Sequence, residues 1–361
     1  MGSTALRVGI VGVSGIARGK HLPGLAKLDT VRLVAFCDLS EERAQAGAAE
    51  FGVPHAQAYT DYRRMLDEAQ LDVVHVCTAN KTHAEISIAA LEAGCHVMCE
   101  KPMAKTAAEA RAMVAAAQRT GKKLTIGYQN RFRADAQYLK RVCMDGGLGD
   151  IYFAKAHAIR RRAVPTFGLF MDQEQQGGGP LIDIGTHSLD LALWFMDNYS
   201  PVSVAGTVYH KLNSREHAAN AWESWDPKKF TMEDSAFGFI RFANGASVML
   251  ESSWALNTRD VREAECTLCG TEAGADMCDG LHINGEHYGC LYDHHVEFKR
   301  HGVDYYAASN EQPGDLEAKT WIDAIINDTE PLVKPQQALV VTEILEAIYT
   351  SSATGSPVTY S

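Results

Sequence analysis

Asp183 and His187 stand four residues apart in the segment GGGPLIDIGTHSLDLALW, residues 177–194. The apolar residues around them predict a helix that the chain enters through three glycines and a proline. Residues at i and i+4 share one helix face, so the two polar side chains are expected to point in the same direction. A pair of this kind can bind a metal, transfer a proton or pack as a satisfied buried pair.

The metal interpretation requires further ligands, because zinc sites use at least three protein side chains. Asp190 is the nearest candidate for a third ligand on the predicted helix. Elsewhere, Cys266-Thr-Leu-Cys269 suggests a zinc site, with Cys278 and Cys290 further along, but no second short pair of cysteines is present. We predict no metal at either place.

A second candidate for chemistry is Lys101, which lies between Glu100 and Pro102 directly after the apolar run HVMC, residues 96–99. If this run is a buried parallel strand, Lys101 lies at the carboxyl edge of the sheet, where ligands bind in such folds. Pro102 restricts the turn, and the bond before a proline is one that can be cis. The alternative is an ordinary solvated loop.

The proton-transfer interpretation assigns a role to each of the three side chains. His187 removes the proton of a hydroxyl group while hydride leaves the same carbon, since histidine titrates near neutral pH. Asp183 orients His187 or holds a neighbouring hydroxyl, and Lys101 stabilises charge on the reacting oxygen. The reverse assignment, with Lys101 as the base and His187 as a relay, is equally consistent with the sequence.

The hydride acceptor is predicted from the N-terminal segment RVGIVGVSGIARGKH, residues 7–21. A strand, a glycine-rich turn and a helix in this order are typical of a dinucleotide site, where the backbone approaches the pyrophosphate at the helix N-terminus. Gly12 fits the first position of the glycine pattern and Ala17 fits the third. Ser14 occupies the second position, where glycine is usual, and Gly15 comes directly after it.

Asp38 ends the next apolar run, VRLVAFCD, at the place where a carboxylate binds the ribose hydroxyls of a dinucleotide. A carboxylate there repels a 2′-phosphate, so NAD is favoured over NADP. The alternative for Asp38 is a helix cap. The segment CTANKTH, residues 77–83, comes after another predicted strand at the same edge. The expected cofactor contacts are Gly12, Val13, Ser14, Gly15, Ile16, Ala17, Asp38, Thr78, Ala79, Asn80, His83, Glu100, Lys101 and Gln129.

Two different patterns divide the chain at about residue 128. Up to that point short apolar runs alternate with helical stretches, which predicts an α/β fold with a parallel sheet covered on both faces. From about residue 150 to 307 alternating strands dominate, among them a hairpin around Asn244-Gly245, which predicts an open, mainly antiparallel sheet. Two late helices, near residues 314–327 and 336–353, are candidates to pack back on the first half.

The composition is that of a globular protein, because 46% of the 361 residues are hydrophobic and 22% are charged. A net charge of −11 argues against nucleic acid and anionic membranes as partners. No apolar run reaches the roughly 18 residues of a membrane span, and the N-terminus lacks the pattern of a signal peptide. Nine scattered cysteines favour a reducing, cytoplasmic compartment.

Taken together, the segments GVSGIA, AFCD, CTANKTH, CEKPMAK, GYQNRF and GPLIDIGTHSLDLALW resemble the Gfo/Idh/MocA family, which includes glucose–fructose oxidoreductase and inositol dehydrogenase. The resemblance implies an NAD-binding Rossmann domain over residues 1–128 and a substrate-binding α/β domain over residues 129–361, whose large open sheet forms homo-oligomers. By motif, Lys101 matches the lysine of the family's Glu-Lys-Pro segment, and Asp183 and His187 match its Asp-x-x-x-His pattern. Ser14 is the departure, and it bears on how closely the backbone approaches the pyrophosphate.

The resemblance also implies hydride transfer between NAD and a secondary alcohol or ketone of a sugar, glycoside or polyol. The segments RRRAVPTFG and QQGGGPLIDIGTHSLDLALWFMDN are similar to those of members that oxidise the third carbon of glucosides. An inositol dehydrogenase, a redox-neutral NAD-dependent glycoside hydrolase and a non-catalytic NAD-binding sensor are the alternatives.

The expected substrate contacts are Lys101, Arg131, Arg161, Asp183 and His187. Arg131 comes after the last predicted strand of the first half, and Arg161 belongs to a run of three arginines that ends a strand of the second half. Ion pairs with acids at an interface are the alternative for that run. Trp254 is a candidate to stack on a sugar ring, although packing in the core or at an interface is the favoured interpretation.

Overall fold

The structure is a computed structural model that describes residues 5–298 and 312–360. The chain divides into two compact units, one of residues 1–129 and 311–339, the other of residues 130–310 and 340–361. This division groups residues 311–339, which come late in the sequence, with the N-terminal unit. No helix among the described residues is long and apolar enough to cross a membrane.

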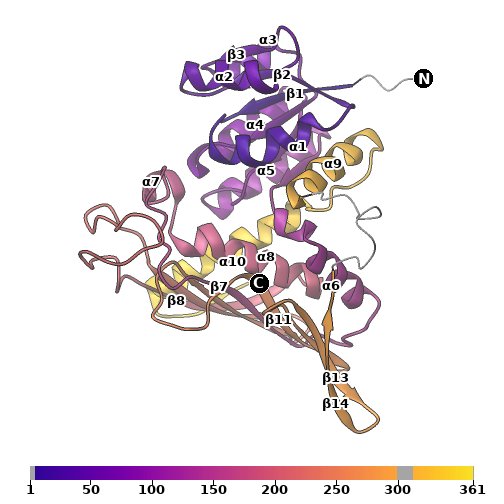
Figure 1. Cartoon of the computed structure of the whole chain (residues 1–361), viewed down its shortest axis with the longest axis vertical. Coiled ribbons are helices and arrows are strands. Elements are labelled where there is room, and N and C mark those ends of the chain that lie inside the picture. The colour runs from indigo at the N-terminus through magenta and orange to yellow at the C-terminus, as the bar shows by residue number, and fades with distance from the viewer. Residues whose placement is uncertain (1–4, 299–311, 361) are drawn as a thin grey trace. The chain divides into compact units, whose positions relative to one another are not determined.

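The first unit is built on a six-stranded parallel sheet (Figure 1). The strand order is β3-β2-β1-β4-β5-β6, and every neighbouring pair is parallel. This order reverses between β1 and β4, and ligands bind at the carboxyl end of the sheet at such a reversal. The strands are β1 (Leu6–Val11), β2 (Val31–Cys37), β3 (Gln57–Tyr59), β4 (Val73–Val76), β5 (His96–Cys99) and β6 (Leu124–Ile126).

Helices cover this sheet, and local sequence signals start several of them. Ser40 accepts the backbone N–H of Arg43 and caps one helix, while Thr106 and Glu109 form a capping box at another. The helices are η1 (Ala17–His21), α1 (Leu22–Ala26), α2 (Glu41–Phe51), α3 (Tyr62–Glu68), η2 (Asn80–Thr82), α4 (His83–Glu92), α5 (Ala107–Thr120) and α9 (Pro313–Ile326).

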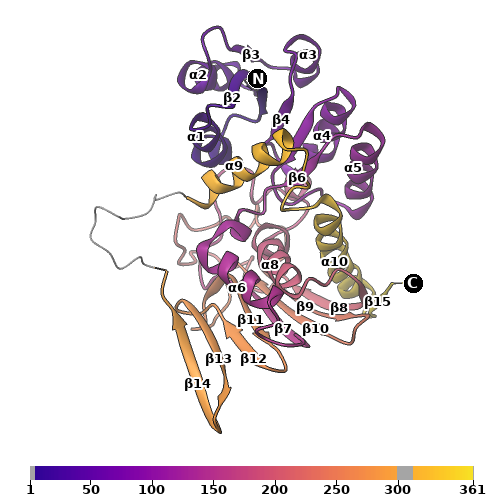
Figure 2. The same cartoon turned by 90° about the vertical axis from the view of Figure 1, so that its right-hand side faces the viewer.

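Helix α9 comes from the end of the sequence, yet it belongs to the core of the first unit. Its residues Ala318, Trp321 and Ile322 are buried in one cluster with Val8 and Leu22. Figure 2 shows α9 beside α1, the first α-helix of the chain. The Rossmann core therefore needs a segment that lies far downstream of its first strand.

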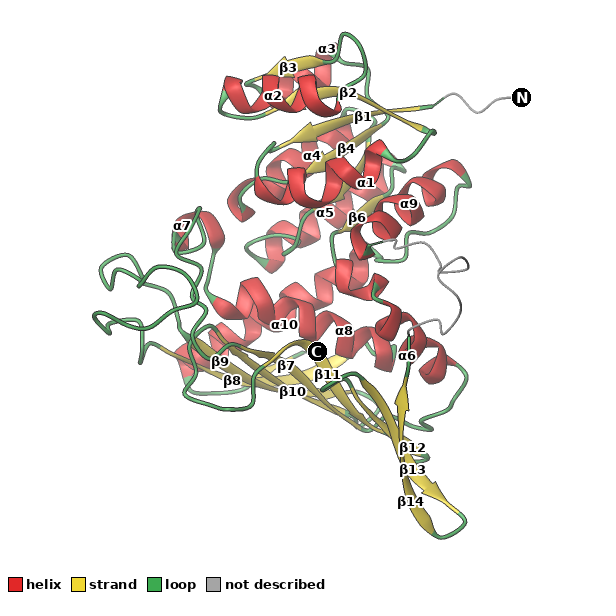
Figure 3. Cartoon of the chain, viewed as in Figure 1, coloured by secondary structure: helices red, strands yellow, loops and turns green. Residues whose placement is uncertain are grey.

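The second unit is built on a nine-stranded sheet that is antiparallel except for the pair β7–β10 (Figure 3). The predicted hairpin around Asn244-Gly245 is confirmed as β9 and β10. The order is β14-β13-β12-β11-β7-β10-β9-β8-β15. The strands are β7 (Phe153–Ile159), β8 (Pro201–Tyr209), β9 (Ser235–Phe242), β10 (Ser247–Ser253), β11 (Arg262–Cys269), β12 (Ala273–Asp276), β13 (Leu281–His287), β14 (Cys290–Val296) and β15 (Val358–Thr359).

One face of this sheet, which we call the inner face, is covered by a helix. On the inner face, Ala154, Ala156 and Ala158 of β7 are fully buried, and their small side chains let a helix pack against β7 and β11. That helix is α8 (Thr186–Met196), which continues from a π-helical segment, η4 (Leu181–Gly185). The other helices are η3 (Gln129–Phe132), α6 (Ala134–Met144), α7 (Gln173–Gln176) and α10 (Pro335–Thr354).

The prediction of an α/β protein with one parallel sheet and a second, mainly antiparallel sheet is therefore confirmed. The late helices predicted near residues 314–327 and 336–353 are α9 and α10. The predicted strands between residues 299 and 307 lie outside the described residues.

Candidate active site

The glycine-rich turn after β1 has the geometry that a dinucleotide requires. Gly12 has φ +89°, and a Cβ atom there would lie 2.5 Å from the carbonyl oxygen of Cys77. Only glycine fits this position. Ser14, Gly15 and Ile16 are exposed where the following helix begins, and open space surrounds the position of a Cβ atom on Gly15. An accessible backbone at a helix N-terminus fits the pyrophosphate of NAD.

Asp38 holds this turn in place from the end of β2. Its Oδ2 accepts the backbone N–H of Val13 at 2.9 Å, and its Oδ1 accepts the backbone N–H of Ser40 at 2.9 Å. The guanidinium of Arg43 also donates to Oδ1, at 2.6 and 3.0 Å. Burial opposes ionisation of Asp38, but these donors outweigh it and lower the pKa of the carboxyl.

The sequence did not point to Arg43, because this residue is not adjacent to Asp38 in the chain. Arg43 reaches back to the carboxylate from the first turn of α2. The predicted helix after Asp38 could have indicated it, because a side chain in the first turn of a helix can lie close to the residues that precede the helix.

The loops after β4 and β5 are tied together by His83. This histidine is fully buried, with Nδ1 2.8 Å from the carbonyl oxygen of Pro102 and Nε2 3.1 Å from that of Thr78. Burial lowers the pKa of His83, so the ring is neutral and donates to one carbonyl at a time. His83 therefore supports the expected cofactor residues Thr78, Ala79 and Asn80, and a contact of its own with NAD stays a prediction.

Glu100 is the centre of a buried polar cluster in the first unit. Its Oε1 contacts the ammonium of Lys20 and lies 2.7 Å from Nε2 of His21, while its Oε2 accepts the backbone N–H of Lys101 at 3.2 Å. Lys20 also lies 2.9 Å from the carboxylate of Glu317 on α9. Burial opposes ionisation of Glu100, but Lys20 and His21 outweigh it and hold the pKa well below its usual range. Lys101 is thus anchored through its backbone to an ionised carboxylate.

One arrangement of protons satisfies the histidines of this cluster. His21 Nδ1 lies 2.9 Å from His75 Nδ1, so one of these two atoms donates and the other accepts. If His21 donates from Nε2 to Glu100, its Nδ1 must accept from His75. Burial lowers the pKa of both imidazoles, in agreement with this neutral arrangement.

Lys101 is half-buried between the buried residues Glu100 and Pro102. The Lys101–Pro102 peptide bond is cis, a question that the sequence left open. At the end of the same unit, Gln129 is half-buried and begins η3.

Asp183 and His187 are distinguished by their exposure. Every residue from 178 to 195 is buried except these two, which are half-buried. Asp183 lies in the π-helical segment η4 and His187 in the first turn of α8, so the regular i, i+4 face expected from the sequence is interrupted by a π turn. Such π turns occur often at functional sites. Within residues 178–195, the two side chains that reach the surface are therefore the carboxylate and the imidazole that were predicted to bind a hydroxyl group and transfer its proton.

Trp254 holds Asp183. Its indole N–H donates to Asp183 Oδ2 at 3.1 Å, and the tryptophan itself is completely buried in a cluster that includes Ile184. The structure thus gives Trp254 the core position that the sequence favoured. It adds a contact that the sequence did not predict.

Glu233 anchors the glycine-rich entry to η4, and nothing in the sequence pointed to it. Its buried carboxylate accepts the backbone N–H groups of Gly179 at 3.0 Å and Leu181 at 3.2 Å, and the hydroxyl of Tyr349 at 2.7 Å. A Cβ atom on Gly179 would lie 2.5 Å from the carbonyl oxygen of Glu233. Gly179 therefore allows close packing against a glutamate 54 residues away, which no local pattern reveals.

The predicted substrate contacts Arg131 and Arg161 differ in whether their side chains are exposed to a ligand. Arg131 is completely buried, and its guanidinium donates to both carboxylate oxygens of Asp190 at 2.9 and 2.7 Å. Arg160 pairs with Glu263 at 2.6 Å, whereas Arg161 is exposed. We therefore keep Arg161, and not Arg131, in the proposed set of substrate contacts.

The third metal ligand considered from the sequence, Asp190, is occupied by this ion pair. Within residues 5–298 and 312–360, no group of three or more histidine, cysteine, aspartate or glutamate side chains is arranged to hold a metal ion. Cys266 is buried, with its thiol 3.5 Å from the carbonyl oxygen of Ser188.

Comparisons with known proteins show the family of this chain. Residues 6–128 match the model of an oxidoreductase family with an NAD-binding Rossmann fold, and residues 136–276 match the GFO/IDH/MocA C-terminal domain. D-glucoside 3-dehydrogenase of Escherichia coli (strain K12) is 36% identical over 362 residues, which cover 99% of this chain and 98% of that protein. Inositol 2-dehydrogenase of Salmonella paratyphi B is 30% identical over 55% of this chain and 57% of that protein.

Among solved structures, levoglucosan dehydrogenase in complex with NADH and levoglucosan superposes with a TM-score of 0.83 at 23% identity, over 99% of both chains. At 23% identity this similarity shows only that the two proteins share a fold. The fold, the glycine-rich turn and the family models together define an NAD-dependent oxidoreductase. The chain belongs to the Gfo/Idh/MocA family.

Proposed function

We propose that this enzyme is a dehydrogenase that oxidises a secondary alcohol of a sugar or glycoside, with the third carbon of a glucoside as the leading candidate. The similarity to D-glucoside 3-dehydrogenase over nearly the whole of both chains supports this substrate class. The observation that carries the proposal is the exposure of Asp183 and His187 alone in the otherwise buried segment of residues 178–195. A carboxylate and an imidazole that both reach the surface of one short segment can bind and deprotonate a hydroxyl group.

Each side chain has a role in the proposed reaction. NAD, when bound, accepts the hydride that leaves the alcohol carbon. His187 takes the hydroxyl proton, and Asp183, fixed by the indole of Trp254, binds His187 or an adjacent hydroxyl group. Lys101, whose backbone is anchored to Glu100, stabilises negative charge on the oxygen. Arg161 contacts a more distant part of the substrate.

A panel of sugars, inositols and methyl glucosides with NAD tests this proposal by NADH absorbance, with NMR of the product to locate the carbonyl carbon. Lys101→Met and His187→Asn should each lower kcat by a factor on the order of 10² to 10⁴. Lys319→Met, at an exposed lysine, is the matched control. Loss of the acidic limb of the pH–rate profile in His187→Asn assigns the base to His187, and its persistence assigns the base to Lys101.

Oxidation of no polyhydroxylated substrate, in either direction, would contradict the proposal. The redox-neutral hydrolase interpretation gains no support, because both named relatives are dehydrogenases. An inositol dehydrogenase remains the second candidate, on the basis of the partial match to inositol 2-dehydrogenase.

We also propose that the enzyme is a homo-oligomer that associates through the outer face of the nine-stranded sheet. Tyr209, Phe239 and Met249 on this face are 40%, 43% and 39% exposed, and Phe239 and Met249 are direct neighbours across β9 and β10. Exposed apolar side chains that gather on one face of a sheet are typical of an association surface. All nine cysteines are free, which supports a reducing compartment such as the cytoplasm.

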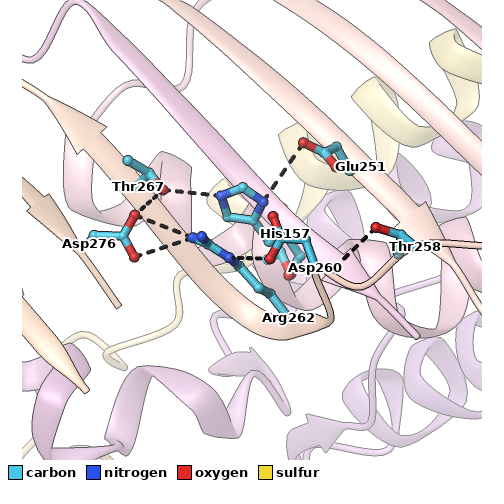
Figure 4. A network of polar contacts seen from close by, with 8 residues as sticks. His157, Glu251, Thr258, Asp260, Arg262, Thr267 and Asp276 are labelled. Carbon is cyan, nitrogen blue, oxygen red and sulfur yellow. Dashed lines mark hydrogen bonds and ion pairs between the residues drawn. The ribbon is translucent and has the colours of Figure 1, made fainter. Parts of the chain in front are cut away.

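A polar network around His157 lies on the same face (Figure 4). Its member Glu251 stands two residues after Met249 on β10, and alternate residues of a strand share one face. Thr267 donates to Asp276 at 2.7 Å, so it accepts from Nε2 of His157, 3.1 Å away. Arg262 contacts Asp276 at 3.3 Å and Asp260 at 2.9 Å. Burial lowers the pKa of His157 to about 4, so its ring stays neutral at physiological pH. Because most polar groups of this network already have hydrogen-bond or ion-pair partners, their positions are fixed before a second copy of the chain binds to this face.

A further inference from the structure

Two loops of the second unit carry aromatic side chains that the active-site proposal does not use. Phe167 and Trp222 are 50% and 45% exposed, and their rings meet edge to face with centroids 5.1 Å apart. Phe170 adds a second edge-to-face contact to Phe167, at 5.4 Å. We call Phe167, Phe170 and Trp222 the aromatic shelf. Exposed aromatic rings in mutual contact form an apolar surface of the kind that meets a ligand or a partner.

The two loops are held together by specific hydrogen bonds. The side-chain amide of Asn220 accepts the backbone N–H of Val164 and donates to the carbonyl oxygen of the same residue, both at 2.9 Å. Nearby, the backbone N–H of Ala221 donates to the carbonyl oxygen of Arg162 at 2.9 Å. The aromatic shelf is therefore formed before any ligand arrives, and little further ordering is needed on binding.

Both loops are anchored on the cluster that supports Asp183. Val164, Ala218 and Trp225 are buried in the same cluster as Ile184 and Trp254. Phe167 lies three residues after Val164, and Trp222 lies three residues before Trp225, a separation that the chain spans in at most about 11 Å. Trp254 in turn donates to Asp183. The two loops that carry the shelf are thus packed on the same buried cluster as the tryptophan that positions the proposed substrate-binding carboxylate.

On the basis of the proposed function, we infer that the aromatic shelf binds the aglycone of the glycoside substrate, and that this aglycone is aromatic or otherwise apolar. Aromatic rings stack on aromatic aglycones in offset or edge-to-face geometry, and such pairs are stabilised beyond the burial of their area. The shelf therefore selects among glycosides by the group that the sugar carries on its anomeric oxygen. The carboxylate of Asp183 and the imidazole of His187 bind the sugar itself.

Initial rates with NAD on three substrates test this inference: glucose, methyl glucopyranoside and phenyl glucopyranoside, the last two of the same anomeric form. Phe167→Ala and Trp222→Ala should each lower kcat/KM for the phenyl glucoside by roughly three- to tenfold. The values for glucose and the methyl glucoside should change by less than about twofold. Tyr288→Ala, at a tyrosine that is 99% exposed on the β13–β14 turn, is the control and should alter none of the three.

A parallel fall for all three substrates, or an unchanged rate with the phenyl glucoside, would overturn the assignment. So would a lower molar mass of the two shelf variants in light scattering, because a second copy of the chain would then cover the shelf. Saturation-transfer NMR on the NAD-bound enzyme separates this inference from the proposed reaction. Phenyl protons that receive saturation in the wild type and lose it in Trp222→Ala support the shelf whether or not the glucoside is oxidised. Equal saturation in both proteins contradicts it.

Discussion

Asp38 and Arg43 form an ion pair at the end of β2, where the ribose of NAD is expected. The carboxylate repels a 2′-phosphate, but the guanidinium beside it would attract one once the carboxylate is neutralised. Asp38→Asn should therefore raise KM for NAD and increase the ratio of kcat/KM for NADP to that for NAD by about tenfold or more. The kinetics of both cofactors with one substrate provide the measurement.

The matched control for this prediction is the double variant Asp38→Asn/Arg43→Ala. Removal of the Arg43 guanidinium should abolish the rise in kcat/KM for NADP, because the cation that attracts the 2′-phosphate is then missing. An unchanged cofactor ratio in Asp38→Asn would show that the 2′ position of the ribose does not lie near Asp38.

At the scale of single elements, Glu233 determines how the chain enters η4. It accepts two backbone N–H groups and a tyrosine hydroxyl while almost completely buried. Glu233→Ala leaves these donors unsatisfied and should lower the free energy of unfolding by about 2–4 kcal/mol, whereas Glu233→Gln, which keeps one acceptor, should lower it less. Chemical denaturation measures both.

Glu216→Ala, at an exposed glutamate of the same unit, is the control and should change the unfolding free energy by less than about 0.5 kcal/mol. Equal stability of Glu233→Ala and the wild type would mean that water replaces the carboxylate at no cost.

Helix α9 introduces a pH dependence into the first unit through Glu317. Burial is the main cause that raises the pKa of this carboxyl from 4.5 to about 7, against the opposing effect of Lys20. A carboxyl whose pKa is raised by folding stabilises the native state below its unfolded pKa, and this contribution is lost as pH rises towards 7. The free energy of unfolding of Glu317→Gln, measured relative to that of the wild type, should therefore rise by about 2–3 kcal/mol between pH 4.5 and 7.

The comparison with Glu317→Gln is necessary because the neighbouring histidines act in the opposite direction. Burial lowers the pKa of both His21 and His75, so their contribution to stability increases as pH rises towards 6.5. Thermal unfolding of the two proteins over this pH range gives the difference, in which the histidine contributions cancel. A difference that stays constant with pH would show that Glu317 is ionised throughout.

At the scale of the whole molecule, the outer face of the nine-stranded sheet should control association. Phe239→Glu places a charge in the middle of the apolar patch, next to Met249 and without a partner of opposite sign on β10 at that position. Burial of an unpaired charge costs several kcal/mol, so we expect the molar mass in light scattering to fall towards that of one chain. Tyr288→Glu, on an exposed turn, should leave the molar mass unchanged. An unaltered assembly in Phe239→Glu would place the interface elsewhere.

The sequence predicted much of this fold, because the relevant signals are local. Alternating apolar runs and helical stretches indicated the parallel sheet, and Asn244-Gly245 between two alternating runs indicated the β9–β10 hairpin. The spacing of Gly12, Asp38 and Lys101 placed candidate groups at strand ends, where the structure has them. In each case a residue type has a strong conformational preference within a few positions of itself.

The element types, the two sheets, the glycine-rich turn and the occurrence of Asp183 and His187 in one segment could therefore be predicted from local sequence. The partners of the buried polar side chains could not, because they depend on how the chain folds in three dimensions. Arg131 is buried against Asp190, Glu233 anchors a turn 54 residues away, and Glu317 joins the cluster around Glu100 from the far end of the chain. Buried charges must find partners wherever the fold brings them, and those partners are set by three-dimensional proximity rather than by spacing along the chain.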